Sequence, residues 1–281
     1  MSRVDQSVGT DLQKNPTSRF FQFKNYFTQE EITVKGKTKE VKVFDKCGFT
    51  WSTKNEDGEY ENHDFDLPIE FALLNGDWVN FKGWNADEKV FYKSTEVKDA
   101  KSVISVSNKE GIVYEFTLND MWGKVEGSKV KDEKISKDVK ARLKQLGVKQ
   151  HSSLYAAIKD ENGEFELINF QLKGANLSGS REKENQPSGW WNVSKDFKKS
   201  KKIYTHYIQM NDWITESGEL GEYGVVNFTL GSKIDEEDNE KLEVLFTELE
   251  DYHKYYLNKG KEAEVVVVAE ESDEDDESLP F

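Results

Sequence analysis

Alternation of apolar and polar residues predicts strands over most of this chain. Residues 31–44 alternate around Gly36-Lys37 and predict a hairpin. Two apolar runs flank Asn75-Gly76, the strongest short hairpin signal in the sequence, and a further hairpin is expected around residues 160–163. Other strands are expected at residues 90–92, 102–106, 112–118, 203–210 and 222–231.

Two segments change to a helical period. Within residues 132–147, apolar side chains recur every three or four positions from Ile135 to Leu146, and Gly147 can end the helix. Residues 235–258 predict a long amphipathic helix that begins with acidic residues and ends before Gly260. Residues 175–202 are rich in Ser, Gly and Lys, and they predict a loop.

The order of these elements predicts a mainly β fold of the α+β type. A helix between groups of antiparallel strands is typical of the five-stranded oligonucleotide-binding (OB) barrel. More than five strands are expected, so we predict a decorated OB-fold-type antiparallel barrel with an internal helix and a long C-terminal helix. The predicted organisation is a flexible N-terminus (1–18), an OB-fold-like domain (19–260) and a disordered acidic C-terminal tail (261–281).

The charge of the chain is distributed unevenly. The formal net charge is −15. Residues 235–281 contain 18 acidic and 4 basic residues, a net charge of −14, which leaves −1 for residues 1–234. A nearly neutral body with an acidic end is typical of an interaction tail, and it leaves the body free to bind a polyanion.

Several classes of function lack their usual residues. The sequence has one cysteine, four scattered histidines, and no phosphate-binding loop, dinucleotide motif, zinc-protease motif or nucleophile elbow. We therefore expect no enzyme, no cofactor and no metal site, although a nuclease built from distant carboxylates stays an alternative. No apolar run approaches the length of a membrane span, so a cytoplasmic protein without membrane contact is expected.

Aromatic side chains alternate with lysines in three stretches of the body. Binding of single-stranded nucleic acid requires aromatic faces for unpaired bases and cations for phosphates. The residues that we predict to bind DNA in this way are Trp78, Phe81, Lys82, Trp84, Phe91, Tyr92, Trp190, Trp191, Lys195, Lys198, Lys199, Lys201, Lys202 and Tyr204.

Each of these residues also has a structural interpretation. Adjacent aromatic residues on a strand point to opposite faces, so Trp78, Phe81 and Trp84 cannot all share one face, and some of them belong to the core. At least one of Trp190 and Trp191 is expected to be exposed, because two adjacent tryptophans are difficult to bury together in a segment rich in Ser, Gly and Lys. Lysine runs are usually solvated surface.

The chain ends in "ESDEDDESLPF", an acidic stretch followed by Leu-Pro-Phe. This ending resembles the C-terminal peptide of bacterial single-stranded-DNA-binding proteins and, more loosely, the acidic tails of phage replicative proteins of that function. The resemblance implies that the tail docks on replication and repair enzymes, such as a polymerase, helicase, primase or nuclease, and competes with DNA for the groove. The tail residues that match are Glu270, Glu271, Asp273, Glu274, Asp275, Asp276, Glu277, Leu279, Pro280 and Phe281.

The body is similar to larger phage single-stranded-DNA-binding proteins in the stretches "LPIEFALLNGDWVNFKGW" and "ELINFQLKGANLSG". The resemblance covers roughly residues 65–180 and implies a decorated OB barrel. We therefore expect a phage-type protein, possible as a homodimer, that binds and protects single-stranded DNA without sequence specificity during replication, recombination and repair. A strand-annealing or recombination-mediator protein and an acidic DNA-mimic inhibitor are the alternatives.

Overall fold

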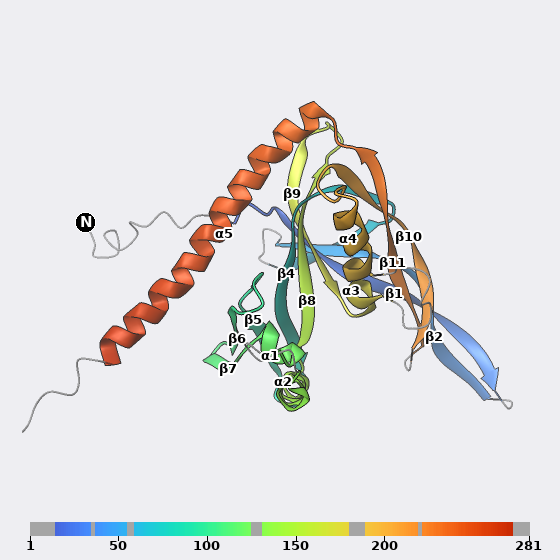
Figure 1. Ribbon diagram of the computed structural model, residues 1–281. Helices are drawn as coiled ribbons and strands as arrows, with labels where there is room; N and C mark the ends of the chain where they lie inside the picture. Colours follow the sequence, from blue (N-terminus) through green and yellow to red (C-terminus); the bar gives the residue numbers. More distant parts are fainter. Residues whose placement is uncertain are drawn as a thin grey trace, which may run out of the picture.

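The computed structural model describes residues 15–34, 37–54, 59–124, 131–179, 189–218 and 221–271 (Figure 1). The strands are β1 (Arg19–Val34), β2 (Lys37–Lys54), β3 (Tyr60–Asp66), β4 (Ile69–Asn85), β5 (Val90–Ser94), β6 (Val103–Asn108), β7 (Gly111–Thr117), β8 (Lys149–Lys159), β9 (Phe165–Lys173), β10 (His206–Gly218) and β11 (Gly221–Lys233). The helices are α1 (Leu118–Trp122), α2 (Glu133–Gln145), α3 (Ala175–Ser178), α4 (Trp190–Lys199) and α5 (Glu236–Glu271).

These strands form one mixed sheet, so the predicted mainly β class is confirmed. Its main path runs β3-β2-β1-β9-β8-β4-β5-β6-β7, and β10 pairs with both β4 and β11. All pairs are antiparallel except β1 with β9. The sheet curls until β11 packs on β2, and Gly224 makes this approach possible, because a Cβ there would lie 2.8 Å from Sγ of Cys47. No backbone pairing between these two strands closes the sheet within the described residues.

Local signals placed several elements correctly. The hairpins β1–β2 and β8–β9 turn where predicted, with Val34 opposite Lys37 and Lys159 opposite Phe165. Helix α2 begins at Glu133 and is capped by Asp132, whose side chain accepts hydrogen bonds from the N–H groups of Lys134 and Ile135 at 2.9 and 3.2 Å. Helix α5 begins as expected but continues to Glu271, beyond the predicted end at residue 258.

The predicted turn at Asn75-Gly76 is wrong. These residues lie inside β4, which pairs with β8 on both sides of two register shifts at residues 73–78. The turn-forming residues instead produce an irregularity within the strand. Asp77 adopts a positive φ of 68°, and the side chain of Asn75 is buried. Because β8 offers a partner to both apolar runs, they continue as one bulged strand.

The predicted loop at residues 175–202 is also wrong, because it contains α3 and α4. Trp190, Val193 and Phe197 lie at helical spacing and are buried against the inner face of the sheet. Figure 1 shows α4 between β8 and the β10–β11 hairpin. Polar residues of this segment lie on the exposed side of α4, whereas residues 180–188 lie outside the described residues.

Three buried clusters organise the molecule. The first fills the space inside the curled sheet and includes Phe21, Phe49, Phe170 and Trp190. The second joins the end of β4 to β5–β7, α1 and α2. The third lies on the outer face of β4, β8 and β9, where Leu242 and Leu249 of α5 pack. No helix among the described residues is long and apolar enough to cross a membrane.

Candidate nucleic-acid interface

Three lysines form a row across three adjacent strands. Lys82 of β4 lies opposite Lys93 of β5 on one side and opposite Lys149 of β8 on the other. Neighbouring strands are about 4.8 Å apart, and side chains directly opposite each other share a face. The register therefore brings three ammonium groups together on the outer face of the sheet. None of them makes an ion pair within the part of the chain that the structure describes.

A second row on the same face lies next to the lysines and consists of Asn80, His151 and Lys173. His151 is buried, and its Nδ1 lies 3.0 Å from the carbonyl oxygen of Lys149. Burial, followed by the charge of Lys82, lowers the pKa of His151 to about 4, with smaller contributions from Lys173 and Lys149. The imidazole is therefore neutral at pH 7, and the cations of this face are its lysines.

Burial also shifts two of the lysines. Burial lowers the pKa of Lys82. The negative charge of Glu96 raises this pKa in part, and the positive charge of Lys173 lowers it further. Burial lowers the pKa of Lys173 as well, together with the charge of Lys149. A partly desolvated ammonium group gains free energy when an anion binds beside it. Neither lysine forms an ion pair within the described residues, and the charge of Glu96 acts on Lys82 alone. The face is therefore suited to phosphate groups.

Two exposed aromatic rings extend the same face. Trp84 and Phe91 lie directly opposite each other on β4 and β5, two residues along each strand from the Lys82–Lys93 pair. Their exposed fractions are 57% and 51%. Residues two positions apart on a strand lie about 7 Å apart on one face, so the rings flank the lysine row. This arrangement offers stacking surfaces beside cations, which is the combination that unpaired nucleic acid requires.

The structure buries four of the aromatic residues that the sequence suggested for stacking. Trp78, Phe81, Tyr92 and Trp190 have exposed fractions of 5% or less and belong to the three clusters. On β4 and β5 the reason is alternation, because Phe81 and Tyr92 point to the opposite face from Lys82 and Phe91. Trp191 is half-buried against the first cluster.

The lysines around α4 are exposed, and the one that contacts β4 does so at Asp77, in the middle of the strand. Lys198 forms an ion pair with Asp77, and Lys199 lies 3.2 Å from Asp196. Lys195, Lys201 and Lys202 are also exposed. Tyr204 is 48% exposed and borders a groove at Leu73 and Asn75, whereas the lysine face begins at Asn80. The structure therefore separates these residues from Lys82, Trp84 and Phe91.

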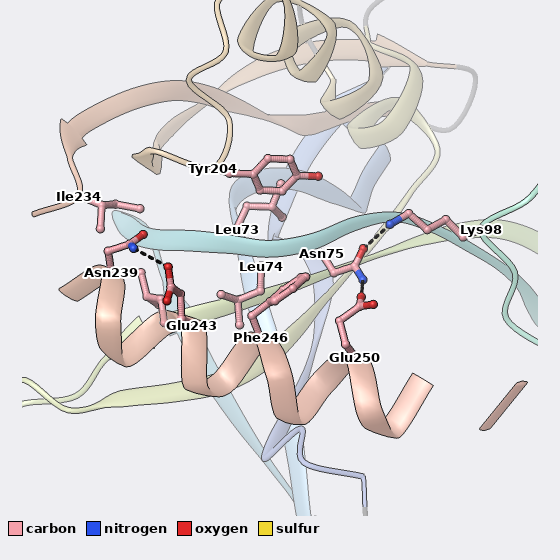
Figure 2. A pocket seen from close by; sticks show the side chains of 11 residues that line it. Leu73, Leu74, Asn75, Lys98, Tyr204, Ile234, Asn239, Glu243, Phe246 and Glu250 are labelled. Carbon is pink, nitrogen blue, oxygen red and sulfur yellow. Dashed lines mark hydrogen bonds between the residues drawn. The ribbon is translucent and has the colours of Figure 1, made fainter. Parts of the chain in front are cut away.

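That groove lies between α5, β4 and Tyr204, and its volume is about 510 Å³ (Figure 2). Asn75 connects its walls: the amide donates to Glu250 at 2.8 Å and accepts from Lys98 at 2.7 Å. The remaining lining is mostly apolar, with the carboxylate of Glu243. The carboxylates of α5 make this groove a poor site for phosphates.

Three lysines of the face, together with Asn80 and His151, were not among the predicted binding residues. Lys93 follows Phe91 and Tyr92 directly, and this spacing could have identified it. Lys149 and Lys173 begin and end strands with no aromatic residue beside them, so only the register connects them to Lys82. The described residues contain no group of three or more His, Cys, Asp or Glu that could hold a metal ion.

Most of the predicted partner-binding tail lies outside the described residues. Glu270 and Glu271 are in the last turn of α5, whereas the other eight, Asp273 to Phe281, are not described.

We expect the stability of the fold to decrease in mild acid. His253 is 4% exposed, and burial together with the charge of Lys98 lowers its pKa to about 4, as found for His151. An unfolded histidine takes up its proton near pH 6.5, so the unfolded chain binds more protons between about pH 6.5 and 4, and stability falls in this window. Urea unfolding should show a loss of about 2 kcal/mol per histidine between about pH 7.5 and 5. A His151→Gln/His253→Gln variant should lack this pH dependence of the free energy of unfolding. If the variant kept the pH dependence of the parent protein, the two histidines would not be its cause.

Comparisons with known proteins identify no relative: no protein-family model, curated protein or solved structure matches this chain.

Proposed function

We propose that this protein binds single-stranded DNA without sequence preference and protects it during replication, recombination and repair. The observation that carries the proposal is the row Lys93–Lys82–Lys149 beside the exposed pair Trp84 and Phe91. Lysines would contact the phosphates, and the two rings would stack on bases. Because lysine ammonium groups and ring faces do not read base edges, binding by this face would tolerate any sequence.

The order of the strands supports a decorated OB-type barrel as part of this proposal. Strands β4, β8 and β9 form a meander, α3 and α4 follow β9, and β10 returns to pair with β4 before β11 pairs with β10. An OB barrel has five strands connected in this way, with a helix between the third and fourth. In this interpretation the β1–β2 hairpin and residues 86–148 decorate the barrel. OB domains bind oligonucleotides over their second and third strands, here β8 and β9.

The charge distribution is compatible with such an activity. The excess negative charge of the sequence lies in residues 235–281, whereas the lysine face lies on the body. We propose that the acidic end recruits replication and repair enzymes through Phe281 and competes with DNA for the lysine face. The proposal requires no cofactor and no catalytic step, and it places the protein in the cytoplasm, or in that of the host cell for a phage protein.

The test of the proposed function is a fluorescence titration of the full chain with oligo-dT, duplex DNA and RNA at low salt. We expect quenching by oligo-dT, weaker binding to the duplex, and an affinity that falls steeply with salt. Equal affinity for duplex and oligo-dT would contradict the stacking role. Absence of binding to all three would overturn the proposal and favour a DNA-mimic protein.

Deletion of residues 269–281 should raise the affinity for oligo-dT by about tenfold at low salt, because it removes seven carboxylates that compete for the lysines. The difference should vanish at high salt, where both interactions are screened. Phe281→Ala keeps every charge and serves as the matched control: DNA affinity should stay unchanged while capture of replication and repair enzymes is lost. Unchanged affinity after the deletion would contradict competition by the tail.

A further inference from the structure

Several buried polar atoms lack a hydrogen-bond partner on the outer face of the sheet, in the row under α5 and in the rows next to it. Trp78 Nε1, Asn80 Oδ1 and Gln171 Oε1 are buried without a hydrogen-bond partner in the described part of the chain, as are both ring nitrogens of His253. Buried polar atoms in folded proteins nearly always have a partner. An interface that leaves so many unpaired is poorly suited to permanent burial.

One ring of α5 occupies a notch between two aromatic side chains of the sheet. The imidazole of His253 lies 4.2 Å from the indole of Trp78, at an interplanar angle of 34°. The ring of Tyr155 meets it from the side at 4.7 Å and 77°. His253 therefore uses the aromatic surfaces of the notch, while neither of its nitrogens forms a hydrogen bond within the described chain.

This notch continues the lysine face. Trp78 lies opposite Ser153 and Ser153 opposite Gln171, one row beyond Asn80, His151 and Lys173 on the same side of the sheet. The outer face thus carries polar and aromatic groups in consecutive rows, from the Trp84–Phe91 pair to Trp78. Helix α5 covers the last of them, and the carboxylate of Glu96 accepts hydrogen bonds from Asn80 at 2.9 Å and from Tyr155 at 2.6 Å at its edge.

The contacts between α5 and the sheet differ along the length of the helix. Its first part is anchored by buried Leu242 and Leu249 and by Asp238, which accepts from Lys159 at 2.6 Å. Farther along the helix, Glu250 accepts a hydrogen bond from Asn75 at 2.8 Å, and the ring of His253 fills the notch. Between Glu250 and His253 the contact with the sheet is therefore a hydrogen bond and a ring contact rather than buried leucines.

We propose that the Trp78–Tyr155 notch is a nucleobase site that His253 of α5 occupies until single-stranded DNA displaces it. A base would stack on Trp78 in place of the imidazole and would offer amino groups to the free acceptors Asn80 Oδ1 and Gln171 Oε1. The side-chain amide of Asn80 fixes this polarity, because its Nδ2 donates to Glu96 at 2.9 Å and to Ser153 at 3.2 Å. The proposal rests on the proposed function and extends its site by one base, and at this single position it adds a preference for bases that carry an amino group.

The inference predicts that freeing the notch strengthens binding to long strands only. His253→Ala should raise the affinity about tenfold for an oligonucleotide long enough to span all rows, because the competent form no longer has to displace the ring. An oligonucleotide of about three nucleotides, which covers only the lysine and Trp84 rows, should bind unchanged. Oligo-dC should gain more than oligo-dT, since thymine lacks an amino group. Phe246→Ala is the matched control, because Phe246 lies on the same helix but lines the groove.

A locked form tests the opposite direction. In a Cys47→Ser background, Asn75→Cys and Glu250→Cys would be joined by a bismaleimide to hold α5 on the sheet, with circular dichroism to verify the fold. Long oligonucleotides should then bind no better than short ones. If the parent, His253→Ala and locked proteins all bind long oligo-dC equally, the notch is overturned and the proposed function stands. If the parent binds no single-stranded DNA, both are overturned.

Discussion

Replacing Lys82, Lys149 and Lys173 together by glutamine should weaken binding to oligo-dT by roughly 10³-fold at low salt. All three lie on one face of the sheet, and none of them forms an ion pair within the described residues. Burial lowers the pKa of Lys82 and of Lys173, and Lys149 is exposed beside them. Each phosphate contact with a single strand contributes about 0.7 to the slope of log affinity against log salt, so the triple variant should reduce that slope by about 2. Fluorescence titrations at several salt concentrations measure both quantities.

The control for this variant removes the same charge elsewhere. Lys195, Lys199 and Lys202 lie on or just after α4, and all three are exposed. Their replacement by glutamine should change affinity only slightly, because these lysines are separated from the aromatic pair. An equal loss in both triple variants would contradict the lysine face and would return the phosphate path to the lysines around α4.

Removing both exposed rings should have the second-largest effect. Trp84→Ala/Phe91→Ala should lose roughly 2–6 kcal/mol of binding free energy, since each stacked base contributes about 1–3 kcal/mol. The salt slope should stay unchanged, because no cation is removed. Part of the tryptophan quenching by oligo-dT should also disappear, because Trp84 would be the fluorophore in contact with a base.

A matched variant for the rings is Trp122→Ala. Trp122 is 37% exposed on α1, and Lys124 lies 4.8 Å from the centre of its ring. This variant also removes one tryptophan, so it controls for the change in fluorescence without touching the face. Thermal unfolding should be nearly unaffected by Trp84→Ala/Phe91→Ala, because both rings are more than half exposed. Wild-type affinity in the double variant would contradict stacking at this site.

Two errors in the sequence-based fold have the same physical origin. Asn75-Gly76 favours a tight turn locally, and the polar composition of residues 175–202 favours a loop. Strand β8 overrides the first preference by pairing with both halves of β4, and the inner face of the sheet overrides the second by burying one side of α4. In both places a partner distant in sequence decides the conformation, and local propensity is too weak to resist it.

The candidate site divides in a similar way. Lys82, Trp84 and Phe91 were identified from local spacing and do come together. Trp78 and Trp190 also lie close to lysines in the sequence, but the structure buries both of them. Whether a ring on a strand faces the solvent depends on which face of the sheet is covered, and the covering elements come from other parts of the chain.

The sequence by itself determined the mainly β class, the hairpins at Gly36-Lys37 and 160–163, helix α2, the start of α5 and the concentration of negative charge in the last part of the chain. These features depend on periodicity, turn residues and charge counts over a few neighbouring positions. Only the tertiary structure decided that Lys149 and Lys173 join Lys82, and that His253 of α5 covers Trp78. Strand register and helix docking pair residues about 65 to 175 positions apart, and no local pattern encodes such pairing.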